Sequence, residues 1–319
     1  MGCLLSSTID YQRLHNIDTF EHMAKSPPLP PEAANLDYWQ GVQNLQTTMF
    51  GTVDLVTPMG SPKSRFVLKQ ARLDQLRAWQ TRRITLDSPE DAVQLQQQHI
   101  TPHPHITPLV LTWHDQRRHL FCILQHYYPN GDLVEYINRY TDAPQHARRW
   151  FRQMVSALHH LHVHCNVVHL DLSPENIVLD HRLNAHLIDF GRAKQGTLTM
   201  TRPQSARAPL MPPETHFETP FATRPLDVWA LGIILFTTLY GTYPWKNAVM
   251  TDPNFNLYVH RGLQPLLQHL ALEPVPGTTE LLELTLQINP HQRPTTDQLT
   301  RHPYVLPNVT HKEQCTLLV

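Results

Sequence analysis

Glycine and cysteine are scarce in this sequence of 319 residues, which contains 11 glycines and four cysteines. The cysteines are scattered and form no C-x-x-C pair; they stand at Cys3, Cys122, Cys165 and Cys315. This usage excludes a disulfide-rich scaffold and is typical of a protein from a reducing compartment. The 22 histidines form no H-E-x-x-H motif and no cluster with cysteine at ligand spacing. We therefore expect surface and core histidines rather than a metal site.

An excess of charge of either sign is also missing, because the formal net charge is −1. Nucleic-acid binding normally needs a basic surface, so we expect no nucleic-acid partner. The longest apolar run, 228–240, is shorter than the roughly 20 residues that a helix needs to cross a bilayer, and it predicts a buried helix. The sequence contains no G-x-x-x-x-G-K-[ST], which excludes a P-loop nucleotidase.

The first residues, MGCLLSST, fit an acylation signal. Gly2 follows the initiator methionine and Ser6 holds the small hydroxyl position of a myristoylation pattern, while Cys3 offers a thiol for palmitoylation. One acyl chain gives marginal membrane binding, whereas two give a stable anchor. We therefore expect a lipid-anchored protein on the cytoplasmic face of a membrane. The alternative is an unmodified N-terminus and a cytoplasmic protein.

Residues 25–31, KSPPLPP, form a short polyproline stretch with a P-x-x-P frame. Such a stretch either docks in an SH3-type groove of a partner or acts as a stiff spacer, and we favour the spacer. We place the N-terminal tail at 1–35 and the start of the folded domain at Leu36.

The folded part changes in character along the chain. Strand-like segments at 43–46, 51–56, 65–70 and 119–127 surround one helix at 88–99, which begins with Ser-Pro-Glu-Asp. Helical spacing of apolar residues then appears at 147–162, 226–240 and 279–287, with short strands at 177–179 and 185–188. This order predicts an α+β fold with a small β-rich lobe (36–126), a larger helical lobe (127–305) and a cleft between them. Residues 306–319 are a C-terminal tail.

Two motifs carry the residues suited to phosphoryl transfer: HLDLSPEN at 169–176 and DFG at 189–191. That reaction needs an oriented hydroxyl, metal ions on the phosphates and fixed positive charge. Asp171 can orient the hydroxyl or accept its proton. Asn176 and Asp189 offer the oxygen ligands that Mg²⁺ prefers. H-x-D-x-x-x-x-N followed by D-F-G rarely arises by chance.

This combination resembles eukaryotic protein kinases of the serine/threonine type, similar to the calmodulin-dependent kinases, over residues 40–305. The resemblance implies the bilobal kinase fold, ATP and Mg²⁺ as cofactors and protein substrates. It places the catalytic base at Asp171 and the metal ligands at Asn176 and Asp189. It also predicts a structural ion pair between Glu214 of MPPE and Arg293 of HQRP, and a buried helix at DVWALG beneath the catalytic loop.

The resemblance also assigns a nucleotide-binding set. Lys69 of FVLK corresponds to the lysine that holds the phosphates and completes the catalytic set, and its partner should be an acidic residue on the helix that follows. Glu90 is favoured for that partner, with Asp91 and Gln94 as alternatives. Gln125 corresponds to the gatekeeper and Asp132 to a residue near the ribose. The full set for ATP is Gly51, Val53, Val67, Lys69, Glu90, Gln125, Tyr127, Asp132 and Leu179.

The glycine-rich loop departs from the family pattern. The segment LQTTMFGTV places Gln46 and Thr48 at two expected glycines and keeps only Gly51. Side chains there hinder the close approach of the backbone to phosphates, which glycine permits.

The catalytic loop departs at two positions. Leu170 replaces an arginine that pairs with a phosphorylated activation loop, so we expect weak dependence on phosphates at Thr197, Thr199, Thr201 or Ser205. Ser173 replaces a lysine that steadies the transferring phosphate. Arg207 is the candidate to take over its role. The intact residues favour an active kinase, and the departures leave a pseudokinase that acts as a binding module as the alternative.

Overall fold

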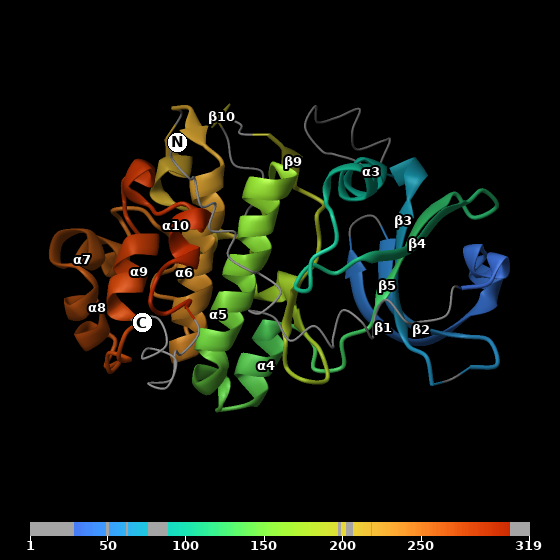
Figure 1. Cartoon of the computed structure of the whole chain (residues 1–319), viewed down its shortest axis with the longest axis horizontal. Helices are drawn as coiled ribbons and strands as arrows, with labels where there is room; N and C mark the ends of the chain where they lie inside the picture. Colours follow the sequence, from blue (N-terminus) through green and yellow to red (C-terminus); the bar gives the residue numbers. More distant parts are fainter. Residues whose placement is uncertain are drawn as a thin grey trace, which may run out of the picture.

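The computed structural model describes residues 29–48, 51–61, 63–75, 89–196, 199–201, 207–217 and 219–306. The acylation signal at Gly2 and Cys3, residues 25–28 of the polyproline stretch and tail residues 307–319 lie outside the described residues, as do Thr197 and Ser205. A sheet-containing lobe lies beside a helical lobe (Figure 1). This arrangement confirms the predicted α+β fold with a small β-rich lobe and a larger helical lobe.

The small lobe contains a five-stranded antiparallel sheet in the order β1-β2-β3-β5-β4. Its elements are η2 (Pro31–Ala34), η3 (Leu36–Tyr38), β1 (Trp39–Thr48), β2 (Gly51–Pro58), β3 (Phe66–Arg72), α3 (Pro89–His99), β4 (Leu109–Asp115) and β5 (Leu120–His126). The expected strands and the helix are present. The strand β4 was not expected from the sequence.

The two faces of this sheet have different roles because successive side chains of a strand point to opposite faces. One face packs into the small hydrophobic core, formed by Trp39, Val56, Leu68, Trp113, Cys122, Leu124 and Ala33. On the other face, Val53 pairs in register with Lys69 and Val67 pairs with Gln125. The odd-numbered positions of β3 therefore place Lys69 on the face away from the core.

The large lobe is built on helices with three short two-stranded sheets. Its helices are α4 (Leu133–Arg139), α5 (Ala143–His159) with the π-helical η4 (His160–Cys165), α6 (Arg224–Tyr240), α7 (Pro253–Arg261), α8 (Leu263–His269), α9 (Thr279–Thr285) and α10 (Thr296–Thr300). The sheets pair β6 (Val167–Val168) with β9 (Lys194–Gln195), β7 (Ile177–Leu179) with β8 (Ala185–Leu187), and β10 (Thr199–Met200) with β11 (Phe221–Ala222). Short 3₁₀ turns are η5 (Pro174–Asn176), η6 (Ala208–Leu210), η7 (Pro213–His216) and η8 (Pro290–Gln292).

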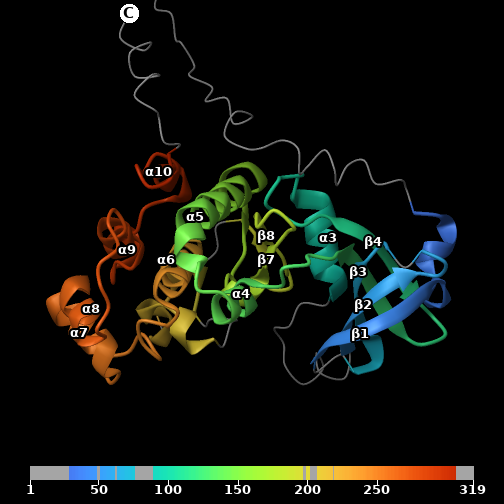
Figure 2. The same ribbon diagram turned by 90° about the horizontal axis from the view of Figure 1, so that it is seen from below.

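Helix α6 is the centre of the large lobe, as its apolar sequence predicts. Residues 227–239 of this helix are all buried, and α6 lies beside α5 (Figure 2). Gly232 permits close packing on α9, because a Cβ at this position would lie 2.4 Å from Thr285 Oγ1. No helix among the described residues is both long enough and apolar enough to cross a bilayer.

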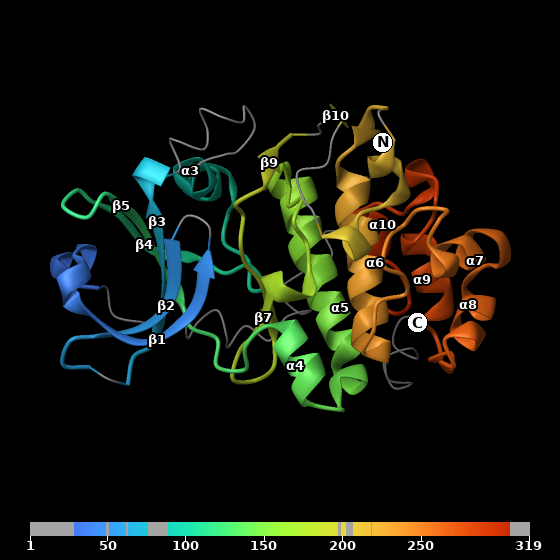
Figure 3. The same ribbon diagram turned by 180° about the vertical axis from the view of Figure 1, so that it is seen from behind.

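The β7–β8 hairpin lies between the helices and the small-lobe sheet (Figure 3). It connects the loop that contains Asp171 to the segment that contains Asp189. The fold therefore brings both predicted motifs to the junction of the two lobes.

Candidate active site

The catalytic loop is fixed from below by Asp227 of α6. Its carboxylate is 1% exposed and accepts hydrogen bonds from the backbone N–H groups of His169 and Leu170, each at 2.9 Å, and from His162 Nε2 at 2.8 Å. Burial alone would raise the pKa of Asp227, but these donors outweigh burial and lower the pKa. They also hold Leu170 at a φ of +62°, a conformation that a leucine rarely adopts. The buried helix expected at DVWALG is confirmed.

Asp171 and Asn176 lie together at the end of this loop. Asn176 Nδ2 donates to the Asp171 carbonyl oxygen at 2.7 Å and to Asp171 Oδ2 at 3.3 Å. Since the amide nitrogen faces Asp171, the amide oxygen of Asn176 is the atom left to face a cation. The spacing of five residues in the motif therefore makes one unit of a proton acceptor and an oxygen ligand.

Lys69 and Asp189 join the two lobes across the cleft. Lys69 Nζ lies 3.2 Å from Asp189 Oδ2, with the two side chains 25% and 43% exposed. The Lys69 ammonium and the backbone N–H of Gly191 hold the pKa of Asp189 at about 2 against the opposing effect of burial. Asp189 is therefore an ionised carboxylate at neutral pH, directed at the lysine expected to hold phosphates.

The predicted partner of Lys69 was wrong for this structure. Glu90 Oε1 lies 3.3 Å from His114 Nε2 on β4, whereas Lys69 pairs with Asp189. Glu90 stands in the first turn of α3, and this helix packs on β4 and on β9. The alternatives Asp91 and Gln94 are both exposed on α3. The start of α3 thus lies over the sheet and away from the lysine.

The nucleotide-facing surface of the small lobe is close to the prediction. Val53, Val67 and Gln125 share the sheet face that carries Lys69, and Gln125 is buried. Tyr127 follows β5 and is half-buried. The region expected to contact a purine base is therefore an apolar surface with one amide at its end.

One residue of the large lobe, Leu179, differs from the prediction. Leu179 is fully buried in the large-lobe core, so it cannot face a nucleotide. The neighbouring Val178 points to the opposite side of β7, is half-buried and forms an isolated bridge with Asp132. Val178 is therefore the residue that belongs to this surface. Asp132 caps α4 by accepting from the Glu135 N–H at 2.8 Å, and burial raises the pKa of Asp132.

Gly51 is required by the pairing of β2 with β3. A Cβ at this position would lie 1.7 Å from the carbonyl oxygen of Gln70 on the neighbouring strand β3. Gln46 and Thr48, which replace two family glycines, are exposed on β1. The one retained glycine thus permits strand pairing, and its presence is not by itself evidence of a phosphate cradle.

Arg207 reaches the catalytic loop, as the sequence suggested. Arg207 Nη1 donates to Ser173 Oγ at 2.5 Å and lies 2.6 Å from Glu175 Oε2. Ser173 is buried, so this contact ties the segment before η6 to the middle of the loop. The positive charge of Arg207 is matched by Glu175.

Arg192 is a residue that the sequence analysis did not identify. It follows DFG directly, and its Nε lies 3.7 Å from Asp171 Oδ2. The β6–β9 pairing, in which Val168 is opposite Lys194, brings this segment beside the start of the catalytic loop. The only signal in the sequence was a basic residue immediately after the metal-ligand motif.

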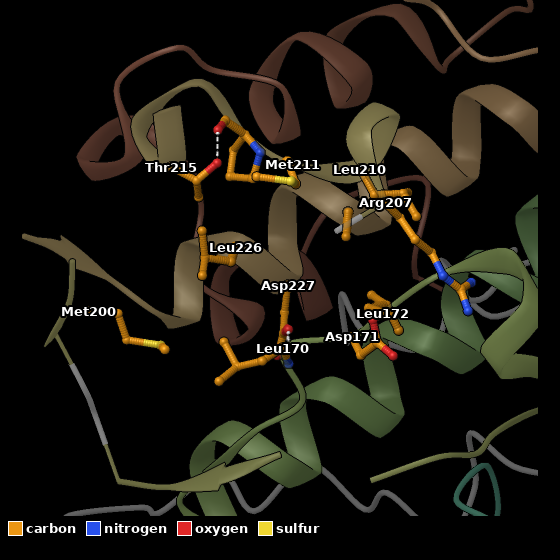
Figure 4. Close-up of a pocket in the computed structure, with 12 residues that line it drawn as sticks. Leu170, Asp171, Leu172, Met200, Arg207, Leu210, Met211, Thr215, Leu226 and Asp227 are labelled. Carbon is orange, nitrogen blue, oxygen red and sulfur yellow. Dashed lines mark hydrogen bonds between the residues drawn. The ribbon is translucent and has the colours of Figure 1, made fainter. Parts of the chain in front are cut away.

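A small cavity lies beneath the site on the side of Leu170. Its volume is about 50 Å³, and Leu170, Met200 and Leu226 are among its apolar lining residues (Figure 4). Arg207 directs its guanidinium away from Met200 and Leu226. The place expected for a phosphate-binding arginine therefore holds a leucine beside a largely apolar cavity, which Asp171, Arg207 and Asp227 also line.

The predicted ion pair beyond the site is confirmed. Arg293 donates to both carboxylate oxygens of Glu214, at 2.6 and 2.7 Å, and its guanidinium lies 4.7 Å from the ring centre of Trp229. Arg293 Nη1 also donates to the Pro225 carbonyl oxygen at the start of α6. These contacts fix the segment that follows the activation loop to the large-lobe core.

The geometry brings the carboxylates of Asp171 and Asp189 to the junction of a β-rich lobe and a helical lobe, and comparison with known proteins identifies the family. A family model described as protein kinase domain matches residues 49–305, which is more than half of the chain. The chain therefore belongs to the protein kinase family.

The relatives are kinases by name, and the first is a serine/threonine kinase. The serine/threonine-protein kinase CHK1 of Saccharomyces cerevisiae is 36% identical over 173 residues, covering 50% of this chain and 31% of the relative. The NUAK family SNF1-like kinase 1 of Mus musculus is 30% identical over 208 residues, covering 64% of this chain and 30% of the relative. The chain thus spans about a third of the length of these relatives. These matches confirm the resemblance to serine/threonine kinases.

Proposed function

We propose that this chain transfers the γ-phosphate of ATP to serine or threonine hydroxyls of protein substrates. The observation that carries the proposal is the convergence of Lys69, Asp171, Asn176 and Asp189 at the junction of the lobes. Family membership supports the reaction class, and the name of the Saccharomyces cerevisiae relative supports serine and threonine as acceptors.

The residues present fit ATP and Mg²⁺. Asp189 is ionised at neutral pH, and the amide oxygen of Asn176 faces away from Asp171. Both side chains therefore offer the hard oxygen ligands that Mg²⁺ prefers. Lys69 lies beside Asp189 and would hold phosphate oxygens. The adenine base of ATP would lie against Val53, Val67 and Val178.

Each residue then has a defined part in the transfer. When bound, ATP supplies the γ-phosphoryl group and Mg²⁺ neutralises charge on its oxygens. Asp171 orients the substrate hydroxyl and accepts its proton as the hydroxyl oxygen bonds to the γ-phosphorus. The bond from that phosphorus to the bridging oxygen breaks, and ADP leaves with the electron pair. Asn176 keeps Asp171 in place through its amide nitrogen.

A phosphotransfer assay with Mg²⁺-ATP and a serine-containing protein substrate tests the proposal. We expect activity in the wild type and a loss of at least about 10²-fold in Asp171→Asn and in Lys69→Met. The exposed residue Asp74 provides the control, and Asp74→Asn should retain wild-type activity. Wild-type transfer no faster than that of the two site variants would favour the pseudokinase alternative. Nucleotide binding without transfer would define that alternative as a binding module.

We further propose that the chain is tethered to the cytoplasmic face of a membrane by acyl chains on Gly2 and Cys3. The support is the sequence MGCLLSST together with the need for two chains in stable anchoring. Residues 25–31 act as the spacer between the anchor and the folded domain in this proposal, and an SH3-type partner for the P-x-x-P frame remains the other interpretation.

Fractionation of cells that express Gly2→Ala and Cys3→Ser variants tests the anchor. We expect both substitutions to move the protein from the membrane pellet to the supernatant, with Gly2→Ala having the larger effect. Ser7→Ala is the matched control because Ser7 lies outside the Gly2, Cys3 and Ser6 pattern. An unchanged membrane fraction in both test variants would contradict the proposal.

A further inference from the structure

The catalytic loop lacks a positive charge at position 173, two residues after Asp171. Ser173 stands there, buried, with its hydroxyl in contact with Arg207 Nη1 at 2.5 Å. Phosphoryl transfer spreads negative charge over the equatorial oxygens of the transferring group, and fixed cations stabilise that charge. Another side chain must therefore supply a cation near Asp171 if the site is to work well.

Arg207 is poorly suited to this part, although it was the candidate from the sequence. The same nitrogen that contacts Ser173 lies 2.6 Å from Glu175 Oε2. The Arg207 guanidinium is held at hydrogen-bond distance by both Ser173 and Glu175, so it is not free to turn toward a phosphate beside Asp171. Arg207 acts instead as a positioning residue, because it holds Ser173 and thereby the loop.

Arg192 has the geometry that Arg207 lacks. Its Nε lies 3.7 Å from Asp171 Oδ2, with the two side chains 35% and 16% exposed. This separation is an ion-pair distance and is longer than a hydrogen bond. Arginine has five N–H donors in a planar fork, so Arg192 can remain near Asp171 and still donate to an incoming phosphate.

Its place in the chain supports the same conclusion. Arg192 follows the segment of Asp189, which pairs with Lys69, and precedes β9, which pairs with β6. It is therefore three residues from the expected metal ligand in the chain and within ion-pair distance of the proton acceptor. Lys69 is on β3 of the small lobe and Arg192 precedes β9 of the large lobe, so the two cations come to the site from different lobes.

We propose that Arg192 contacts the γ-phosphate and supplies the positive charge that Ser173 does not. This inference rests on the proposed kinase function for its kinetic consequence, but its binding consequence holds for a chain that binds nucleotide without transfer. In both cases Arg192 distinguishes a triphosphate from a diphosphate.

Calorimetric titration tests the binding consequence in the full chain with Mg²⁺. The probes are a non-hydrolysable ATP analogue and ADP. We expect Arg192→Gln to weaken the analogue about tenfold while ADP affinity stays unchanged. Arg192→Lys should recover part of the difference. Arg182→Gln is the control, because Arg182 is an exposed arginine in the turn between β7 and β8. Equal losses for both nucleotides, no loss for either, or no nucleotide binding by the wild type would overturn the proposal.

Kinetic rescue tests the consequence for transfer. We expect Arg192→Gln to lower kcat about 10²-fold and to raise KM for ATP about tenfold, in line with its weaker binding of the triphosphate. Adding Ser173→Lys to this variant should recover at least about tenfold, because it returns the charge to the loop. A rise in kcat in Arg192→Gln would mean that Arg192 inhibits Asp171 and would overturn the proposal. A wild type without transfer that still prefers the triphosphate through Arg192 would overturn only the kinase function.

Discussion

The two halves of the active site are held in different ways. In the large lobe, Asp227 is 1% exposed and accepts three hydrogen bonds, and Arg293 is buried in a two-point contact with Glu214. In the small lobe, β1 is exposed from its second residue onward, and Glu90 pairs with an exposed histidine. The contacts of Asp227 and Arg293 are buried, whereas the polar side chains of β1 and the Glu90–His114 pair are open to solvent.

This difference determines which half can adjust. Removing one partner of a buried, hydrogen-bonded pair leaves an unpaired polar group and costs several kcal/mol, whereas an exposed ion pair contributes little. The loop that carries Asp171 therefore has one strongly favoured geometry. The Glu90–His114 contact is weak enough to exchange at low cost, whereas Gln96 of the same helix donates a buried hydrogen bond to the Thr107 carbonyl oxygen. The departures from the family in the small lobe affect the half that is least tightly fixed.

The largest expected effect comes from breaking the buried half at Asp227. An asparagine at this position keeps one acceptor oxygen but turns the other into a donor that faces backbone N–H groups. We expect Asp227→Asn to lower the free energy of unfolding by about 3 kcal/mol, as measured by urea denaturation. Asp74→Asn, which removes an exposed pair with Arg72, is the control and should change it by less than about 0.5 kcal/mol. Similar losses in the two variants would contradict the comparison.

A smaller effect on stability is expected from a substitution of Gly51, because the small-lobe sheet has no room for a side chain at this position. The Cβ of Gly51→Ala would meet the Gln70 carbonyl oxygen, so β2 and β3 must separate. We expect a loss of about 2 kcal/mol in the free energy of unfolding, measured by thermal denaturation. Gly41→Ala on β1 is the matched control, because a Cβ there meets no atom within 4 Å. A stable Gly51→Ala protein with weakened ATP binding would instead assign Gly51 to the phosphates.

Much of the site could be predicted because its motifs are local. The spacing from Asp171 to Asn176 is set by one loop, and DFG and FVLK each place their acidic or basic residue on a short segment of fixed geometry. The fold was predicted for the same reason, since alternation and helical spacing are properties of neighbouring residues. Strand β4 was missed because its apolar run follows proline and histidine residues that favour a loop.

The errors arose where the answer depends on distant residues. In the run Ile177 to Leu179 all three side chains are apolar, so the pattern alone did not decide which of them faces the cleft. The partner of Lys69 depends on how α3 lies on β4, and the role of Arg192 depends on the pairing of β6 with β9. Packing between separate elements determines these features, and the sequence of one element does not contain it.

The smallest expected effect concerns phosphorylation of the activation segment. Leu170 lines a largely apolar cavity together with Met200 and Leu226. Residue 170 therefore offers no positive charge to a phosphate on the exposed Thr199 or Thr201. The segment is attached instead by the β10–β11 pairing and by the Glu214–Arg293 ion pair. We expect a phosphatase-treated sample to keep more than about half of its activity in the Mg²⁺-ATP assay. Thr199→Ala and Thr201→Ala should behave like the treated wild type. Loss of most activity after phosphatase treatment would mean that a cationic side chain at another position binds the phosphate. In that case the large-lobe half of the site would depend on modification despite its buried contacts.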